Sequence, residues 1–299
     1  MNADSGRNSS ARLPAESFFL PALPGQRFCI YHAPHPDTAC RGALIYVHPF
    51  GDEMNRSRHM VAVQARLLAE KGYGVLLIDL FGCGDSTGEF GDARWEIWLT
   101  DLALAKQWLE DRLFTRIGLW GLRLGALLAL DFAHSGQSRM APLILWQPVI
   151  SGKSFMTELL RMRVAGDMLS EAVTLGHDRK APGTQALRSA LRAGESLEIG
   201  GYEIAPALAF AIEALDVKAL PVNTAPTHWF NIVRPVEGVG YAHSPALVEV
   251  IDAWQRQGAD LRMHTAPGLP FWATQELSEC PELLSMTTAL LENALVSPA

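Results

Sequence analysis

Cysteine is scarce in this sequence of 299 residues. The four cysteines stand at positions 29, 40, 83 and 280, and they form neither a C-x-x-C pair nor a metal-ligand spacing. This pattern argues against a disulfide framework and against a cysteine-based metal site. We therefore expect scattered reduced thiols, as in a cytoplasmic protein, and no metal or other cofactor.

Basic charge and long apolar runs are also in short supply. The 25 Lys and Arg residues against 32 Asp and Glu give a net charge of −7, which disfavours binding to a nucleic-acid backbone. The longest apolar stretch, around Leu124 to Leu130, is far shorter than the ~20 residues of a membrane span. The N-terminus lacks the apolar segment of a secretory signal, so residues 1–15 are expected to form a disordered lead-in. These absences predict a cytoplasmic protein with no nucleic-acid partner and no membrane span.

The first half of the chain is rich in short apolar runs that alternate with amphipathic segments. After an entry hairpin over residues 17–34, the expected strands cover 41–48, 73–80, 116–120 and 142–146, and the expected helices cover 52–71, 95–109 and 124–133. Runs that are apolar throughout indicate strands buried on both faces of a sheet. Their alternation with helices predicts an α/β fold with a mostly parallel sheet and helices on both faces.

The pattern changes between residues 151 and 220. Helices are expected at 155–173 and 206–215, and a small hairpin is expected around Gly200-Gly201. Sheet-like elements then return with a strand at 229–233, a helix at 245–257, a strand at 260–264 and a helix at 281–296. We interpret residues 153–220 as a mainly helical cap inserted into a core made of residues 16–152 and 221–299.

One turn connects an apolar strand directly to an apolar helix. It reads Gly121-Leu122-Arg123-Leu124-Gly125, with glycines two positions before and two after the central residue. The same spacing occurs in the G-x-S-x-G elbow, where a strained backbone presents a nucleophilic serine. Here the central residue is Arg123, whose guanidinium stays protonated and can neither attack a carbonyl nor act as a base.

Three segments together resemble the α/β-hydrolases. Residues 41–51 resemble the strand and oxyanion loop, residues 79–86 resemble a D-x-x-G-x-G-x-S loop, and residues 120–126 resemble the nucleophile elbow. The chain is also similar to the exosortase A system-associated hydrolases of type 2, on the segment HPFGDEMNRSR at 48–58, the elbow GLRLGA and Pro270-Phe271-Trp272. The resemblance implies an α/β-hydrolase fold, a hydrolase by name, and a place beside exopolysaccharide or protein-sorting pathways.

A serine hydrolase needs a nucleophile, oxyanion donors, an acid and a histidine. The backbone N–H groups of Leu124 and Phe50 are candidate oxyanion donors, since Pro49 has none to give. Glu237 lies where the acid is expected, although a solvated loop glutamate fits equally well. No histidine occurs near residues 268–272, and His264 falls earlier, inside a strand, as either a catalytic or a packed histidine. Two of the three triad members are therefore missing at their expected places.

Other polar residues offer partial substitutes. His48 is a candidate general base or, alternatively, a residue that orients the oxyanion loop. Asp85 is a candidate to accept a proton or to pair with an arginine, whereas Ser86 and Cys83 are expected to support their turn. Trp272 is expected to line the pocket because it follows the last strand.

Arg123 itself requires a partner, since a cation at a helix N-terminus is disfavoured by ~0.3–1 kcal/mol. One alternative is an internal salt bridge to Asp52, Glu53, Glu237 or Glu276. The other is an anion site formed with the helix N–H groups, with Arg56 and Arg58 nearby.

Two functions follow from these alternatives. In the first, the protein is an unconventional or catalytically silent member that binds an anionic ligand, a carboxylate or phosphate, or a partner protein of an exopolysaccharide or protein-sorting pathway. In the second, it hydrolyses ester, thioester or related acyl substrates with water activated between the oxyanion donors and His48, Asp85 or Glu237.

Overall fold

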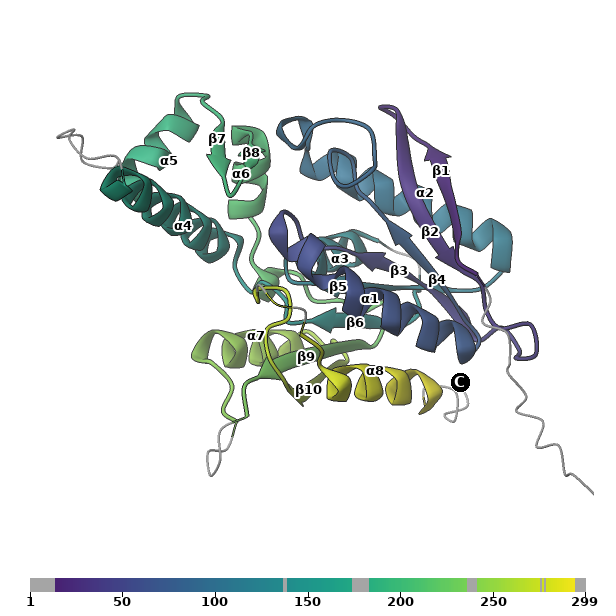
Figure 1. The fold of residues 1–299 in the computed structure, drawn as a ribbon. Coiled ribbons are helices and arrows are strands. Elements are labelled where there is room, and N and C mark those ends of the chain that lie inside the picture. Colours follow the sequence, from purple (N-terminus) through teal and green to yellow (C-terminus); the bar gives the residue numbers. More distant parts are fainter. Residues whose placement is uncertain are drawn as a thin grey trace, which may run out of the picture.

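The fold is built on one eight-stranded sheet, which Figure 1 shows at the centre of the molecule. A computed structural model describes residues 14–136, 139–173, 183–235, 241–274, 276 and 278–293. The strands lie in the order β1-β2-β4-β3-β5-β6-β9-β10. Their bounds are β1 (Glu16–Pro21), β2 (Gln26–His32), β3 (Gly42–Val47), β4 (Tyr73–Ile78), β5 (Ile117–Leu122), β6 (Leu143–Trp146), β9 (Thr227–Val233) and β10 (Leu261–Pro267).

The strand directions confirm the mostly parallel sheet. The pairs from β4 through β3, β5, β6 and β9 to β10 are all parallel. Only β1 and β2 run antiparallel to their neighbours, as the predicted entry hairpin requires. The carboxyl ends of the parallel strands therefore share one edge, where side chains from β3, β4 and β5 can meet.

Helices cover both faces of the sheet. The buried residues of α1 (Asp52–Glu70) and α8 (Pro281–Asn293) pack with Tyr46 and Trp120 on one face. Those of α2 (Trp95–Leu113), α3 (Leu124–Ser135) and α7 (Pro245–Arg256) pack on the other face with Ile45 and Val47. Successive β3 residues thus point to opposite cores, which is why this strand reads as continuously apolar.

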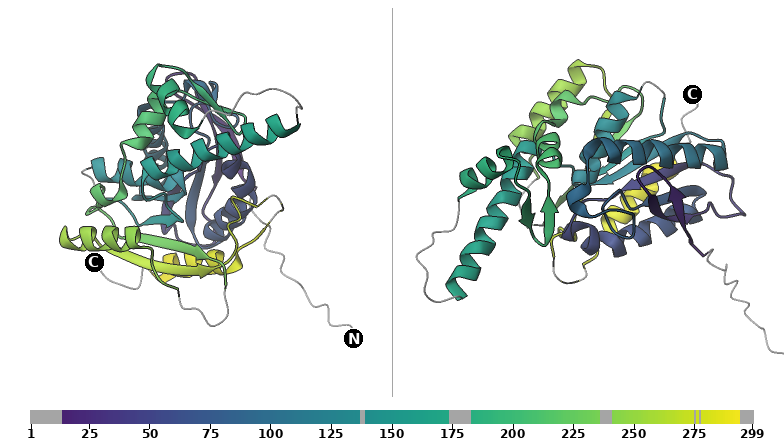
Figure 2. Two further views of the ribbon diagram at one scale, coloured as in Figure 1. Left: turned by 90° about the vertical axis from the view of Figure 1, so that its left-hand side faces the viewer. Right: turned by 90° about the horizontal axis from the view of Figure 1, so that it is seen from above.

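The segment between β6 and β9 leaves the sheet, as the two views of Figure 2 show. It contains α4 (Gly152–Val173), α5 (Thr184–Arg192), a hairpin of β7 (Leu197–Ile199) and β8 (Tyr202–Ile204), and α6 (Pro206–Glu213). Two aromatic contacts join this segment to the core. Phe155 of α4 meets Phe50 with ring centroids 5.7 Å apart, and Tyr202 of β8 meets Phe90 at 5.5 Å. The interpretation of residues 153–220 as a cap remains a prediction.

Several predicted features fall outside the described residues. Residues 1–13 of the expected lead-in and Glu237 are among them. Within the part of the chain that is described, no helix combines the length and apolar character needed to cross a membrane.

A buried ion pair links the entry hairpin to α2. The Nε atom of Arg27 donates to Asp101 Oδ1 at 2.7 Å, and both side chains are almost completely buried. Arg27 also donates to the carbonyl oxygen of Pro24, and Asp101 Oδ2 accepts from the N–H of Phe81. This pair therefore ties β2, α2 and the loop after β4 together.

Replacing Arg27 with Met should lower the free energy of unfolding by ~3–5 kcal/mol, because Asp101 would stay buried without its cation. Urea denaturation measures this change. Arg262→Gln is the matched control, since its ion pair with Asp260 is about half exposed and is worth less than ~1 kcal/mol. Equal, small losses for both variants would contradict the structural role of the buried pair.

Candidate active site

The turn between β5 and α3 has the geometry of a nucleophile elbow. Arg123 has φ 54° and ψ −117°, a conformation that L-residues rarely adopt. The flanking glycines have no room for a side chain. A Cβ atom on Gly125 would lie 2.2 Å from the carbonyl oxygen of Val47, and one on Gly121 would lie 2.4 Å from the Cα of Ala126. The strained turn is thus present in full, with an arginine at its apex.

Arg123 is held by two neighbours. Its Nε atom donates to Glu53 Oε1 at 3.1 Å, and its guanidinium carbon lies 5.8 Å from the ring centroid of Trp272. The side chains of Arg123 and Glu53 are 17 % and 24 % exposed, so this ion pair is largely shielded from water. Of the two alternatives derived for Arg123, the internal salt bridge is therefore formed, and its partner is Glu53.

Glu53 was predicted from the sequence only as one of four possible partners of Arg123. It lies in the first turn of α1, directly after the loop that follows β3. Burial raises the pKa of its carboxyl above the ordinary value, while Arg123 lowers it and Glu158 raises it further. Its Oε2 atom is buried and has no hydrogen-bond partner. The acidic pair Asp52-Glu53 at a helix start was the available signal, but sequence alone gave no reason to choose Glu53 over the other carboxylates.

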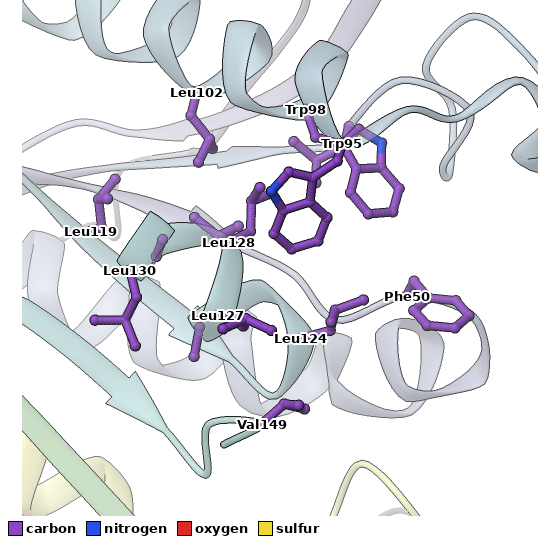
Figure 3. Close-up of a cluster of buried hydrophobic side chains, with 14 of the residues drawn as sticks. Phe50, Trp95, Trp98, Leu102, Leu119, Leu124, Leu127, Leu128, Leu130 and Val149 are labelled. Carbon is purple, nitrogen blue, oxygen red and sulfur yellow. The ribbon is translucent and has the colours of Figure 1, made fainter. Parts of the chain in front are cut away.

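Aromatic side chains leave very little room beside the two candidate oxyanion donors. Neither the N–H of Phe50 nor that of Leu124 donates a hydrogen bond within the described chain. The ring of Phe50 stacks on Phe90 with centroids 5.1 Å apart and meets Phe155 edge-on. The cavity beside Phe50 and Leu124 has a volume of about 10 Å³, room for roughly one water molecule. Figure 3 shows Phe50 and Leu124 in the same apolar cluster as Trp98. No acyl group fits in this cavity as it stands.

His48 is fully engaged with the backbone. Its Nε2 atom accepts from the N–H of Leu80 at 3.1 Å, and its Nδ1 atom hydrogen-bonds the carbonyl oxygen of Pro49. The ring is therefore neutral with the proton on Nδ1, and burial lowers its pKa. This arrangement matches the alternative in which His48 orients the oxyanion loop. It leaves no ring nitrogen to take a proton from water, so the geometry speaks against His48 as a general base.

Asp85 lines a separate, polar cleft. The cleft has a volume of about 670 Å³ and lies between the loop after β4 and the β7–β8 hairpin. Arg123, Leu124 and Trp272 are not among its lining residues. The backbone N–H of Asp85 donates to Asp79 Oδ2 at 3.0 Å, and its own side chain is exposed. The structure therefore does not bring Asp85 together with the elbow.

The neighbours of Asp85 support their turn. Ser86 Oγ donates to the carbonyl oxygen of Asp79 and accepts from the N–H of Phe28 at 2.9 Å. Burial raises the pKa of the Cys83 thiol, which keeps it protonated and unreactive. Ser86 thus supports its turn as the sequence predicted, and Cys83 is buried beside it.

His264 contacts the neighbouring strand. Its Nε2 atom lies 3.1 Å from Nδ1 of His228, and its ring stacks on Phe230 with centroids 4.6 Å apart. This is the packed-histidine alternative. Among the described residues, no group of three or more His, Cys, Asp or Glu side chains is arranged to hold a metal ion.

Comparison with known proteins supports the fold. A family model described as serine aminopeptidase, S33, matches residues 38–186, just under half of the chain. No curated protein matches the sequence significantly.

Solved structures match over nearly the whole chain. Est1E from Butyrivibrio proteoclasticus with ferulic acid bound has a TM-score of 0.62 at 18% identity, covering 93% of this chain and 98% of that chain. The proline iminopeptidase of Mycobacterium smegmatis has a TM-score of 0.58 at 18% identity over the same shares. A thermostable carboxyl esterase from Bacillus coagulans has a TM-score of 0.60 at 14% identity, covering 94% and 99%.

At these sequence identities, the similarity to solved structures establishes the fold of this chain alone. That fold agrees with the strand order, the parallel pairing and the elbow described above. The narrower resemblance to the exosortase-associated type is a prediction beyond it. The chain has the α/β-hydrolase fold, with an arginine at the position of the nucleophile.

Proposed function

We propose that this protein binds a small anion, a carboxylate or a phosphate, at the elbow and does not catalyse acyl transfer. The observation that carries the proposal is Arg123 at the apex of the elbow, with a single N–H donated to Glu53. Its two terminal nitrogens, Nη1 and Nη2, donate no hydrogen bond within the described chain. The site thus offers a fixed positive charge, and the Nη1 and Nη2 groups of Arg123 are available to donate hydrogen bonds to a ligand.

The surroundings of Arg123 favour an anion. The N–H of Leu124 opens α3 at the same turn, and a helix N-terminus attracts negative charge. The indole of Trp272 limits the orientations open to the guanidinium. Glu53 occupies the position beside Arg123 that a ligand carboxylate or phosphate would take. The ligand therefore competes with an internal carboxylate.

The same contacts weigh against acyl chemistry. Guanidinium cannot form an acyl intermediate, both nitrogens of His48 are engaged, and the space at the oxyanion donors holds about 10 Å³. A tetrahedral intermediate needs a nucleophile, a base and room for the oxyanion. The described residues at the elbow supply neither the nucleophile nor the room in this conformation, and His48 is not available as the base.

A second candidate function is hydrolysis by activated water, and one observation favours it. Glu53 Oε2 is buried and unpartnered, and burial raises the pKa of this carboxyl, as in many general bases. In this version Glu53 takes the proton that the sequence assigned to His48, Asp85 or Glu237. The cytoplasmic location, and a partner protein from an exopolysaccharide or sorting pathway, rest on composition and on the family resemblance.

A serine-directed fluorophosphonate probe should leave the protein unlabelled, because no activated hydroxyl stands at the elbow. Wild type should also hydrolyse short acyl esters no faster than buffer. Arg123→Ser should remain inactive, since restoring the hydroxyl does not restore a base. Labelling is read by gel fluorescence and turnover by product absorbance. Ester turnover by wild type that disappears in Glu53→Gln would establish the second function instead.

Sulfate should bind more tightly as the pH falls from 8 toward the raised pKa of Glu53. Protonated Glu53 releases Arg123 and no longer repels the anion, whereas sulfate keeps its charge over this range. Titration calorimetry should show tight, pH-independent binding to Glu53→Gln and affinity lowered on the order of tenfold or more in Arg123→Gln.

Asp52→Asn is the control for the loss of a negative charge. Asp52 is adjacent to Glu53 but pairs with Arg56, so this variant should keep the pH dependence of wild type. Sulfate binding that is the same in wild type and Arg123→Gln would refute the anion site.

A further inference from the structure

A second cavity lies on the α1 side of the sheet, away from the elbow. Its volume is about 210 Å³, and its surface is mostly apolar. Figure 1 shows α1 lying over the sheet near β3 and β4, and β2 is the next strand toward the β1 edge. The lining residues come from these four elements and from the turns after β3 and β4: Phe28, Ile30, Tyr46, His48, Met54, Ser57, Arg58, Val61, Ala62, Leu77, Ile78 and Asp79.

The helical repeat of α1 explains which of its residues form the helix side of this cavity. Met54, Ser57 and Val61 are spaced by three and four residues, so they face the sheet together and are buried. Phe28 and Ile30 on β2 are only half-buried, because α1 contacts β2 less extensively than it contacts β4. The cavity is the space left between the helix and β2.

A hydroxyl group in the cavity wall lacks a well-formed hydrogen bond. Tyr46 is 5 % exposed and lines the cavity; its Oη atom lies close enough to the Ser57 side chain to interact with it, but it has no partner at hydrogen-bonding geometry. The nearby hydroxyl of Ser57 donates instead to the carbonyl oxygen of Met54 at 3.0 Å. A buried hydroxyl without a well-formed hydrogen bond is unfavourable, so a ligand oxygen that accepts its proton would be favoured.

A cation stands at the mouth of the same cavity. The side chain of Arg58 is 45 % exposed and lies 3.6 Å from Asp79 Oδ2, beyond hydrogen-bond distance. Asp79 Oδ2 already accepts from the N–H of Asp85. Arg58 is thus ion-paired with Asp79 but donates no hydrogen bond within the described chain, so a ligand carboxylate would compete with Asp79 for its N–H groups.

We propose that this lateral cavity binds a small hydroxylated aromatic carboxylate. The aromatic ring would lie between α1 and β2, the carboxylate would bind Arg58, and the phenolic oxygen would accept a hydrogen bond from Tyr46. The size is suitable, since an engineered apolar cavity of about 150 Å³ already takes up benzene. The apolar walls exclude a fully hydrated anion such as sulfate, which separates this site from the elbow. The proposal does not depend on the function proposed above.

The test uses 4-hydroxybenzoate and benzoate as probes on the full chain, with dissociation constants measured by ligand-observed NMR. Wild type should bind 4-hydroxybenzoate saturably. Tyr46→Phe should weaken 4-hydroxybenzoate about fivefold and leave benzoate unchanged, as expected for one lost hydrogen bond. Arg58→Gln should weaken both probes about tenfold or more.

Two further variants block or spare the cavity. Ala62 lies half-buried on α1 at the lining, so Ala62→Trp should fill the entrance and abolish binding. Arg56→Gln is the matched control, since Arg56 lies one half-turn away and pairs with Asp52 rather than lining the cavity. It should bind like wild type.

Arg123→Gln decides between the two sites. The lateral site predicts unchanged binding of both probes in this variant and no competition by sulfate. No saturable binding to wild type, binding that survives Ala62→Trp, or binding lost in Arg123→Gln but kept in Arg58→Gln would each overturn the proposal. Thermal unfolding midpoints near that of wild type show that each variant is folded. Arg58→Gln, at an exposed position, keeps the test decisive if Ala62→Trp fails to fold.

Discussion

The ion pair between Arg123 and Glu53 joins the turn after β5 to the first turn of α1. In α/β-hydrolases this position is where a strained backbone presents a nucleophile to substrate. Here the residue at the apex is largely buried in an internal ion pair, and its guanidinium lies over the ring of Trp272. The arrangement of the neighbouring residues is consistent with this change, since Phe50 and Phe155 fill the adjoining space.

Other polar side chains near the elbow also form hydrogen bonds within the protein. His48 holds the loop after β3 by bonding two backbone groups, and Ser86 fastens the loop after β4. Each of these polar side chains is satisfied by the chain itself. Glu53 Oε2 and Tyr46 Oη are among the buried side-chain atoms of the described chain that lack a hydrogen-bond partner. Unsatisfied buried groups are where a folded protein still has binding energy to offer.

The sheet and its helices were predictable because buried strands and amphipathic helices have distinct periods that the sequence displays plainly. The empty nucleophile position was predictable too, since the glycine spacing identifies residue 123. The partner of Arg123 was not, because four carboxylates distant in sequence were equally eligible and only the path of α1 selects Glu53. The roles of His48 and Asp85 were left open for a similar reason. The hydrogen bonds of His48 and the separate cleft of Asp85 depend on how the loops after β3 and β4 fold against each other.

The glycines at 121 and 125 have a wider consequence. Both are required because backbone atoms of Ala126 and Val47 lie where a side chain would be, whatever residue stands between them. Close packing of the sheet against α3 is therefore enough to require the G-x-x-x-G spacing. In a chain of this fold the two glycines report on packing, and only the residue between them decides whether the turn can carry a nucleophile.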